Sequence, residues 1–325
     1  MAGERWGRRQ FLGRAMAAGG GVVALAGSGY AGYRWPRGSG GGSAPTSPSS
    51  PPSSVPARGD TDAVDHFVTR PDLTPPRVTV THRRLSGLPA PAGPRYVLVS
   101  PKGYQADGPG QQGLMILDRR GRLVWFLPRP GHSSSPFDLQ VQTYRGQQVL
   151  TWWQGTVVTG HGQGSCHVAD SSYREIATVQ AGNGLQADLH ELCLTPHGTA
   201  LITAYRTAAA DLSAIGGPRR GQVLACQAQE VDVQSGRLLF SWDSLDHVPV
   251  TESYGKPATG KSAAPFDYFH INSVSLAPDG DLLISARNTW TVYKVARPGG
   301  EVVWRLNGKR SDFEMGGGSR FYWQH

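Results

Sequence analysis

Cysteine is scarce in this sequence. It occurs only at Cys166, Cys193 and Cys226, and no two of these residues have the C-x-x-C spacing. An odd number of cysteines cannot form a complete disulfide framework, and the sequence shows no pattern of four clustered ligands for a structural zinc site. We therefore expect buried free thiols with at most one disulfide pair, and we expect neither a metal nor a cofactor.

Charged residues are also few, at 17% of the chain, although the net charge is +8. Most of that charge is N-terminal, because residues 1–59 contain seven Arg and one Glu, which leaves only about +2 after Arg58. No stripe of Lys and Arg occurs in the remainder. The sequence lacks the basic surface that nucleic-acid binding requires, so we expect no nucleic-acid partner.

Helical periodicity is weak throughout. No apolar pattern with a period near 3.6 residues lasts for long. The sequence is instead rich in turn-forming and aromatic residues, with 43 Gly, 24 Pro and 9 Trp. This composition is typical of many short strands joined by tight turns, and it predicts an all-β fold.

The first residues have the pattern of an export signal. A basic segment from Arg5 contains R-R-Q-F-L at 8–12, which matches the twin-arginine pattern, and a weakly apolar stretch follows at 15–32. Glycines interrupt that stretch, which is too mildly apolar for a typical membrane span, while A-L-A at 24–26 offers a cleavage site. We predict that residues 1–35 are a twin-arginine signal, either cleaved or kept as an anchor. The alternative is a chance Arg pair before an uncleaved anchor helix.

This signal predicts where the protein acts. The twin-arginine export machinery would be its partner, and the folded part would be extracellular or periplasmic, or anchored on the outer side of the cytoplasmic membrane. Residues 36–59 are rich in Pro, Ser and Gly and have almost nothing apolar to bury, so we predict a disordered linker. The globular domain is expected at 60–325.

Two kinds of hairpin alternate along that domain. The first kind has two apolar runs around a turn that ends in Gly, and it occurs at 140–153, 190–205 and 270–287. The second kind ends in aromatic residues, and it occurs at 114–127, 229–242 and 293–306, with a looser copy at 166–179.

One hairpin of each kind makes a four-stranded meander. Repetition of such a meander at roughly 40–50 residues is the sequence pattern of a β-propeller. We predict about five units, with long insertions at 206–224 and 244–266, and an all-β sandwich is the alternative. The sequence ends at 321–325 within what reads as a further hairpin. Because a propeller brings its last blade against its first, we expect this one to be incomplete at the C-terminus.

Four polar residues occupy related positions in these repeats. His190 and His270 each stand at the start of a hairpin of the first kind, and His325 follows aromatic residues where the next such hairpin would begin. Arg287 follows the second strand of the 270–287 hairpin. The innermost strands of a propeller line its central channel, so we expect these side chains to converge there. The alternative for each histidine taken alone is a structural role with backbone contacts.

Other histidines and aromatic residues lack this relation. We interpret as surface or turn residues those histidines without a repeat position, namely His132, His161, His167, His197 and His247. Trp152, Trp153 and Tyr205 lie near the ends of inner strands; we expect them to pack between blades rather than stack on an aryl ligand.

One block of sequence is distinctive enough to suggest a family. It reads D-Y-F-H-I-N-S-V from 267, D-G-D-L-L-I-S-A-R from 279, V-W-R-L-N-G from 303 and S-D-F from 311. R-P-D-L at 70–73, D-L-H-E-L at 188–192 and the terminal Q-H agree with it. Over residues 60–325 the sequence resembles the bacterial arylsulfotransferase (arylsulfate sulfotransferase) family.

The resemblance implies a six-bladed propeller that moves a sulfuryl group from a phenolic sulfate ester to a phenol. Such an enzyme needs no nucleotide sulfate donor, because a sulfated histidine carries the group. On the matching positions His325 would be the nucleophile, with His270, Arg287 and His190 as the other catalytic residues. Phenols and aryl sulfate esters would be the small-molecule partners.

The chemistry of these residue types agrees with that role. A neutral imidazole is a usable nucleophile near pH 7, and cationic donors stabilise the charge on a transferring sulfuryl group as they do for phosphoryl transfer. The main alternative is a non-catalytic exported propeller that binds a ligand or a protein, because fold alone does not determine function. A quinone-dependent propeller dehydrogenase is less consistent with the sequence, since no Asp/Glu/Asn cluster for Ca²⁺ is apparent.

Overall fold

The computed structural model describes residues 64, 67, 70–80, 96–101, 110–129, 134–258, 260 and 263–325. All of these belong to one compact unit, residues 58–325. The predicted signal at 1–35 and linker at 36–59 lie outside the described residues, as does His132. Among the residues that are described, no helix has the length and apolarity needed to cross a membrane.

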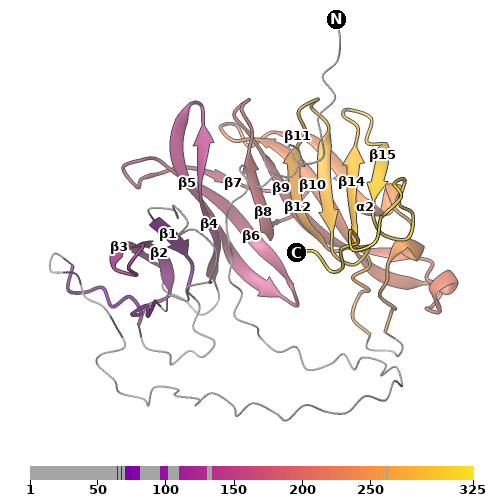
Figure 1. The fold of residues 1–325 in the computed structure, drawn as a ribbon, viewed down its shortest axis with the longest axis horizontal. Coiled ribbons are helices and arrows are strands. Elements are labelled where there is room, and N and C mark those ends of the chain that lie inside the picture. Colours follow the sequence, from indigo (N-terminus) through magenta and orange to yellow (C-terminus); the bar gives the residue numbers. More distant parts are fainter. Residues whose placement is uncertain are drawn as a thin grey trace, which may run out of the picture. The chain divides into compact units, whose positions relative to one another are not determined.

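The fold is all-β, as predicted, and its strands form successive antiparallel meanders (Figure 1). The first described meander has three strands, β1 (Tyr96–Val99), β2 (Gly113–Asp118) and β3 (Leu123–Pro128). The second has four, β4 (Ser135–Tyr144), β5 (Gln147–Val158), β6 (His161–Ala169) and β7 (Glu175–Val179).

The third and fourth meanders also have four strands each. The third contains β8 (Ala187–Leu194), β9 (Thr199–Ala210), β10 (Gly221–Asp232) and β11 (Leu238–Asp243). The fourth contains β12 (Ile271–Leu276), β13 (Leu282–Ala286), β14 (Thr291–Val295) and β15 (Val302–Leu306). Short helical turns η2 (Ser213–Ile215), α2 (Ser244–His247) and η3 (Val250–Glu252) lie in the connections.

The alternating hairpins predicted from the sequence are confirmed. The first kind forms β4–β5, β8–β9 and β12–β13, and the second kind forms β2–β3, β6–β7, β10–β11 and β14–β15. The second and third meanders join into one eight-stranded sheet, but the only backbone pair between β6 and β8 is Gly164 with Ala187. In the described part of the chain, no sheet closes on itself.

The expected insertion at 206–224 is largely strand instead. Strands β9 and β10 pair continuously, from Thr199 opposite Asp232 at one end to Ala210 opposite Gly221 at the other. Only a short connection that contains η2 is left between them. The 244–266 segment does leave the sheet, and it contains α2 and η3.

The first strands of the meanders are neighbours. Strand β8 contacts both β4 and β12, although the latter two lie more than a hundred residues apart in sequence. Residues at the start of each meander are therefore brought close together.

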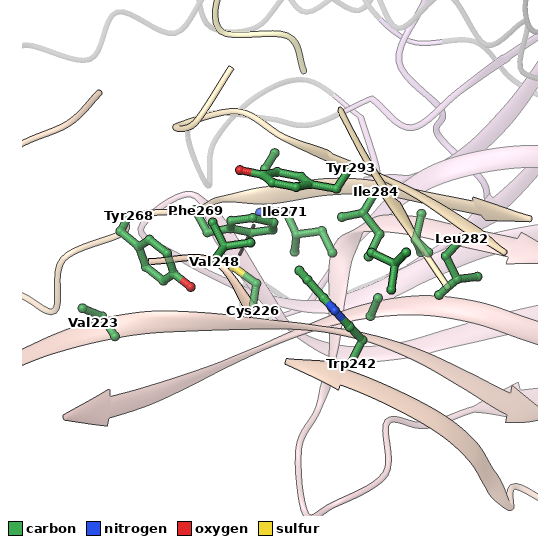
Figure 2. Close-up of a cluster of buried hydrophobic side chains, with 14 of the residues drawn as sticks. Val223, Cys226, Trp242, Val248, Tyr268, Phe269, Ile271, Leu282, Ile284 and Tyr293 are labelled. Atoms are coloured by element: carbon green, nitrogen blue, oxygen red, sulfur yellow. Dashed lines mark hydrogen bonds between the residues drawn. The ribbon is translucent and has the colours of Figure 1, made fainter. Parts of the chain in front are cut away.

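A hydrophobic core between the third and fourth meanders anchors one of these starts (Figure 2). Tyr268 and Phe269 are fully buried in it, and the Phe269 ring lies 5.8 Å from that of Trp242 and 5.3 Å from that of Tyr293. Each large apolar side chain buried in this way contributes about 1.5–3 kcal/mol to stability. The backbone just before His270 is fixed by this packing.

The cysteines lie inside these sheets as free thiols, as predicted. Burial raises the pKa of Cys166, of Cys226 and, to about 11, of Cys193. None of the three provides a reactive thiolate near neutral pH.

Candidate active site

Three histidines meet at the starts of the meanders. His190 lies in β8, His270 immediately precedes β12, and His325 follows β15. The Nε2 atom of His325 lies 3.2 Å from Nε2 of His190 and 3.3 Å from Nε2 of His270. One nitrogen from each ring lies within 4.8 Å of the other two. We call these three residues the histidine triad.

His190 is held by a buried carboxylate. Its Nδ1 lies 2.6 Å from Oδ2 of Asp188, which also accepts a hydrogen bond from the hydroxyl of Thr203. Oδ1 of Asp188 accepts one from the backbone N–H of Gly162 at 2.5 Å. Burial alone would raise the pKa of Asp188, but the charge of His190 and these hydrogen bonds lower it. The ionised carboxylate keeps Nδ1 of His190 protonated, so Nε2 points into the triad.

Glycine at 162 is required by this arrangement. A Cβ atom there would lie 2.6 Å from a ring carbon of Trp153 and 2.9 Å from the backbone nitrogen of Leu189. The absence of a side chain lets β6 approach β8 closely enough for the Gly162 N–H to reach Asp188.

His270 is oriented in the same way by another carboxylate. Its Nδ1 lies 2.5 Å from Oδ2 of Asp267, and its side chain is almost completely buried. The backbone of His270 has φ of 56°, in the left-handed region that non-glycine residues rarely adopt. The N–H of Arg287 donates to the carbonyl of His270 at 2.9 Å and helps to hold it there. Such strain is common where a side chain must be aimed at a functional site.

His325 is the most exposed member of the triad. Partial burial, followed by the positive charges of His190, His270 and Arg287, lowers the pKa of His325 to about 4. Its imidazole is therefore neutral near pH 7, with a lone pair available on one nitrogen. Gln324 fixes the segment, because its carbonyl accepts from the Asn272 side chain and its amide donates to the carbonyls of Ala286 and Thr291.

Arg287 lies beside the triad and contacts an aromatic group. Its guanidinium lies 4.8 Å from the ring centroid of Trp323, and its charge contributes to the lowered pKa of His325. Trp323 is 40% exposed and packs edge-on against Trp290, which also stacks on Tyr254 at 3.6 Å. This gives the site an accessible aromatic surface next to a cation.

The other aromatic residues considered from the sequence divide into two groups. Trp152 and Trp153 are almost fully buried, and the Trp153 indole donates to the carbonyl of Ala187, so both pack within the fold as expected. Tyr205 lies next to the triad, with ring centroids 6.3 Å from His190 and 6.1 Å from His270. Its hydroxyl donates a hydrogen bond to the carbonyl of Ile271, the residue after His270. Tyr205 therefore packs against the triad as a structural residue and not as an aryl-binding surface.

The interpretation of the remaining histidines as surface or turn residues was wrong for His161, whereas His167 and His247 are half-buried. His161 is buried and stacked on Tyr205 at 4.9 Å, His167 is stacked on Trp152, and His247 is stacked on Trp242. Of the four of these histidines that the structure describes, only His197, in the β8–β9 turn, is fully exposed. His161 is separated from the triad by the Tyr205 ring, on which it stacks. This position depends on tertiary packing, and no repeat in the sequence indicated it.

A pair of half-buried carboxyl groups on the first strands, Asp138 in β4 and Glu191 in β8, was not indicated by the sequence. Burial, and then the negative charge of Asp138, raise the pKa of Glu191 to about 8. Burial likewise raises the pKa of Asp138, which lies close enough to His190 to feel its charge. Glu191 follows His190 directly in β8, and successive side chains of a strand point to opposite faces.

Comparison with known proteins adds a family assignment. Residues 140–325 match the family model described as Arylsulfotransferase (ASST). No curated protein matches the chain significantly. A crystal structure of a protein of unknown function from Bacteroides caccae is similar at 13% identity and a TM-score of 0.29, covering 66% of this chain and 73% of that chain. A similarity this low carries no argument about fold or function.

Proposed function

The chain belongs to the arylsulfotransferase (ASST) family, and from this premise we propose that it transfers sulfuryl groups between phenols without a nucleotide sulfate donor, through a sulfohistidine at His325. The observation that carries the proposal is the meeting of a neutral His325 imidazole with two carboxylate-held imidazoles at 3.2 and 3.3 Å. A nucleophile and two potential proton donors thus lie within contact distance of one another.

The first half-reaction begins at His325. A lone pair on its Nε2 attacks the sulfur of an aryl sulfate, an S–N bond forms, and the bond from sulfur to the phenolic oxygen breaks. With a pKa of about 4, His325 is available as a nucleophile over the whole neutral range. The leaving phenolate takes a proton from Nε2–H of a protonated His190 or His270, which Asp188 or Asp267 holds in place.

The second half-reaction reverses these steps with a different phenol. The acceptor hydroxyl gives its proton back to the same histidine while its oxygen attacks sulfur, and the S–N bond breaks to restore His325. Arg287 and the two carboxylate-held histidines donate to the sulfuryl oxygens, where negative charge accumulates in the transition state.

Trp323 provides a place for the aryl ring. Its ring is exposed, lies two residues before His325, and is covered on one side by the Arg287 guanidinium. Stacking of a phenyl ring there would place the ester oxygen near both the nucleophile and the cation. This accessible aromatic surface supports phenolic sulfates as donors and phenols as acceptors.

The proposal extends to the architecture and the location. Three four-stranded meanders have neighbouring first strands, and His190 in β8 and His270 just before β12 lie at the starts of two of them. This arrangement supports a β-propeller with an axial site. The twin-arginine pattern at 8–12 supports export before action outside the cytoplasm.

The test is sulfuryl transfer by the full chain. We expect release of 4-nitrophenol from 4-nitrophenyl sulfate that depends on an added phenol, and transfer of ³⁵S-labelled sulfate onto a peptide that contains His325. His325→Ala should abolish both, whereas His197→Ala, in an exposed turn, should not change them. Label found on His190 or His270 would contradict the nucleophile assignment but not the reaction class. Tight binding of aryl sulfates without any release of phenol would favour the non-catalytic propeller instead.

A further inference from the structure

The histidine triad has fewer N–H donors than acceptor nitrogens at its centre when all three rings are neutral. Asp188 and Asp267 each fix a proton on Nδ1 of their histidine, so Nε2 of both His190 and His270 carries a lone pair when the ring is neutral. His325 can supply at most one Nε2–H to two such neighbours. At least one pair of lone pairs then faces each other, unless one of the rings is protonated or a metal cation lies between them.

The spacing of the nitrogens suits a particular kind of cation. Zinc binds imidazole nitrogen at about 2.0–2.1 Å with tetrahedral angles, which separates neighbouring ligand nitrogens by about 3.3 Å. The two measured separations are 3.2 and 3.3 Å, and one nitrogen from each of the three rings lies within 4.8 Å of the others. The widest of the three separations is therefore the one between His190 and His270, and these two rings must move closer together for all three nitrogens to bind one ion.

The second layer of contacts has the form that metal sites use. Metal-binding histidines usually donate their other ring N–H to a carboxylate, which fixes the ring and raises its basicity. Both buried members of the triad do so, His190 with Asp188 and His270 with Asp267. The second oxygen of Asp267, Oδ1, is buried without a hydrogen-bond partner, so the negative charge of this carboxylate is only partly compensated.

The local charge also favours a divalent ion. Two carboxylates, Asp188 and Asp267, contact the triad histidines directly and carry two negative charges. The guanidinium of Arg287, which lies over the Trp323 ring, carries one positive charge. The exposure of His325 leaves a route for the ion and a fourth position for water. We propose that His190, His270 and His325 bind one divalent transition-metal ion of the zinc type, in a three-histidine site with an open fourth position.

This site would regulate the reaction. A metal ion bound to Nε2 of His325 uses the same lone pair that attacks sulfur, so the metal-bound protein cannot form the sulfohistidine. Metal binding and sulfuryl transfer are therefore mutually exclusive. This consequence rests on the proposed function, but the metal site itself does not.

Titration with Co²⁺ tests the site directly. The full chain without a polyhistidine tag, treated with EDTA and dialysed, should bind one Co²⁺ per chain with the visible absorption of a four-coordinate ion, and Zn²⁺ should displace it. His270→Ala and His325→Ala should remove the absorption, while His197→Ala should keep it. Asp267→Asn should weaken binding about 10–100-fold. Because His325 is exposed, its variant keeps the test valid if the others fail to fold, which circular dichroism would show.

A second arm separates this proposal from the proposed function. Sulfuryl transfer is measured in EDTA and then with rising Zn²⁺; we expect inhibition that parallels Co²⁺ occupancy and is reversed by EDTA. Metal binding by a protein that is inactive in EDTA would support the site and contradict the proposed function. Activity in EDTA without saturable Co²⁺ binding, or binding unaffected by the triad variants, would overturn the metal site.

Discussion

Nε2 of His190 lies 3.2 Å from Nε2 of His325, although 135 residues separate the two in the chain. The contact depends on Asp188, which binds the other nitrogen of the His190 ring and the backbone N–H of Gly162. The orientation of one ring is thus set by two neighbouring meanders, and several predictions concern the residues that maintain it.

Asp188→Asn tests whether the carboxylate orients His190. An amide would place an NH₂ group against either the Gly162 N–H or the His190 ring, because all the partners of Asp188 are donors. We expect kcat/KM to fall about 10–100-fold, the loss that is usual when a carboxylate that orients a metal-binding histidine is removed. The change should appear in kcat, with the KM for aryl sulfate nearly constant. A rise in KM alone would contradict an orienting role.

Arg287→Ala tests charge stabilisation in the transition state. Loss of one such donor usually lowers kcat by about 10²–10³. Arg287→Lys should recover part of this loss, because it keeps the charge without the planar guanidinium over Trp323. Equal activity of both variants and the wild type would show that the arginine acts only in packing.

Trp323→Ala tests the aryl-binding surface. Removing one aromatic stacking partner costs about 0.5–1.5 kcal/mol, so the KM for 4-nitrophenyl sulfate should rise about 2–10-fold with a smaller change in kcat. Phe313→Ala, at another exposed aromatic residue, is the matched control and should leave KM unchanged. An unchanged KM in Trp323→Ala would place the aryl ring elsewhere.

Glu191→Gln tests the pH dependence of stability. The pKa of Glu191 is raised to about 8 in the folded protein, against about 4.5 when unfolded, so the folded state binds the extra proton between these values. The wild type should therefore lose stability as pH rises from about 4.5 through 8. The variant carries no titrating group there, so its Tm advantage over the wild type should grow across this range. Melting curves at pH 5, 7 and 9 measure it, and a constant difference would contradict the raised pKa.

Gly162→Ala tests the close approach of β6 to β8. The new methyl group would meet the Trp153 ring and the Leu189 backbone, which should cost about 1–3 kcal/mol of stability. Activity at temperatures where the variant is folded should also fall, because the hydrogen bond to Asp188 is displaced. Gly317→Ala is the control, since a Cβ there meets no atom within 4 Å.

The sequence predicted the parts of the fold that depend on local chemistry. Turn glycines such as Gly146 and Gly280, which adopt positive φ, made the hairpins recognisable. The Ala-rich segment at 206–210 gave no strand signal, because its strand character comes from pairing with β10 rather than from side-chain propensity. It was therefore interpreted as an insertion.

The residues of the candidate site also divide into those that the sequence indicated and those that depend on tertiary contacts. His190, His270 and Arg287 occupy repeat positions that are visible in sequence. His161 and the pair of Asp138 and Glu191 do not, since their environments come from strands distant in the chain. Their burial, and the pKa shifts of the two carboxyl groups, depend on the assembled sheets.

The joint between the second and third meanders has a consequence for heat inactivation. Only one backbone pair, Gly164 with Ala187, connects β6 to β8, and the nearby hydrogen bond from Gly162 to Asp188 crosses the same joint. Opening this joint disrupts few backbone hydrogen bonds, so it should require less free energy than global unfolding. His190 would then lose its anchor while each meander kept its own hydrogen bonds. Enzymatic activity is therefore expected to disappear on heating several degrees before the β-sheet signal does.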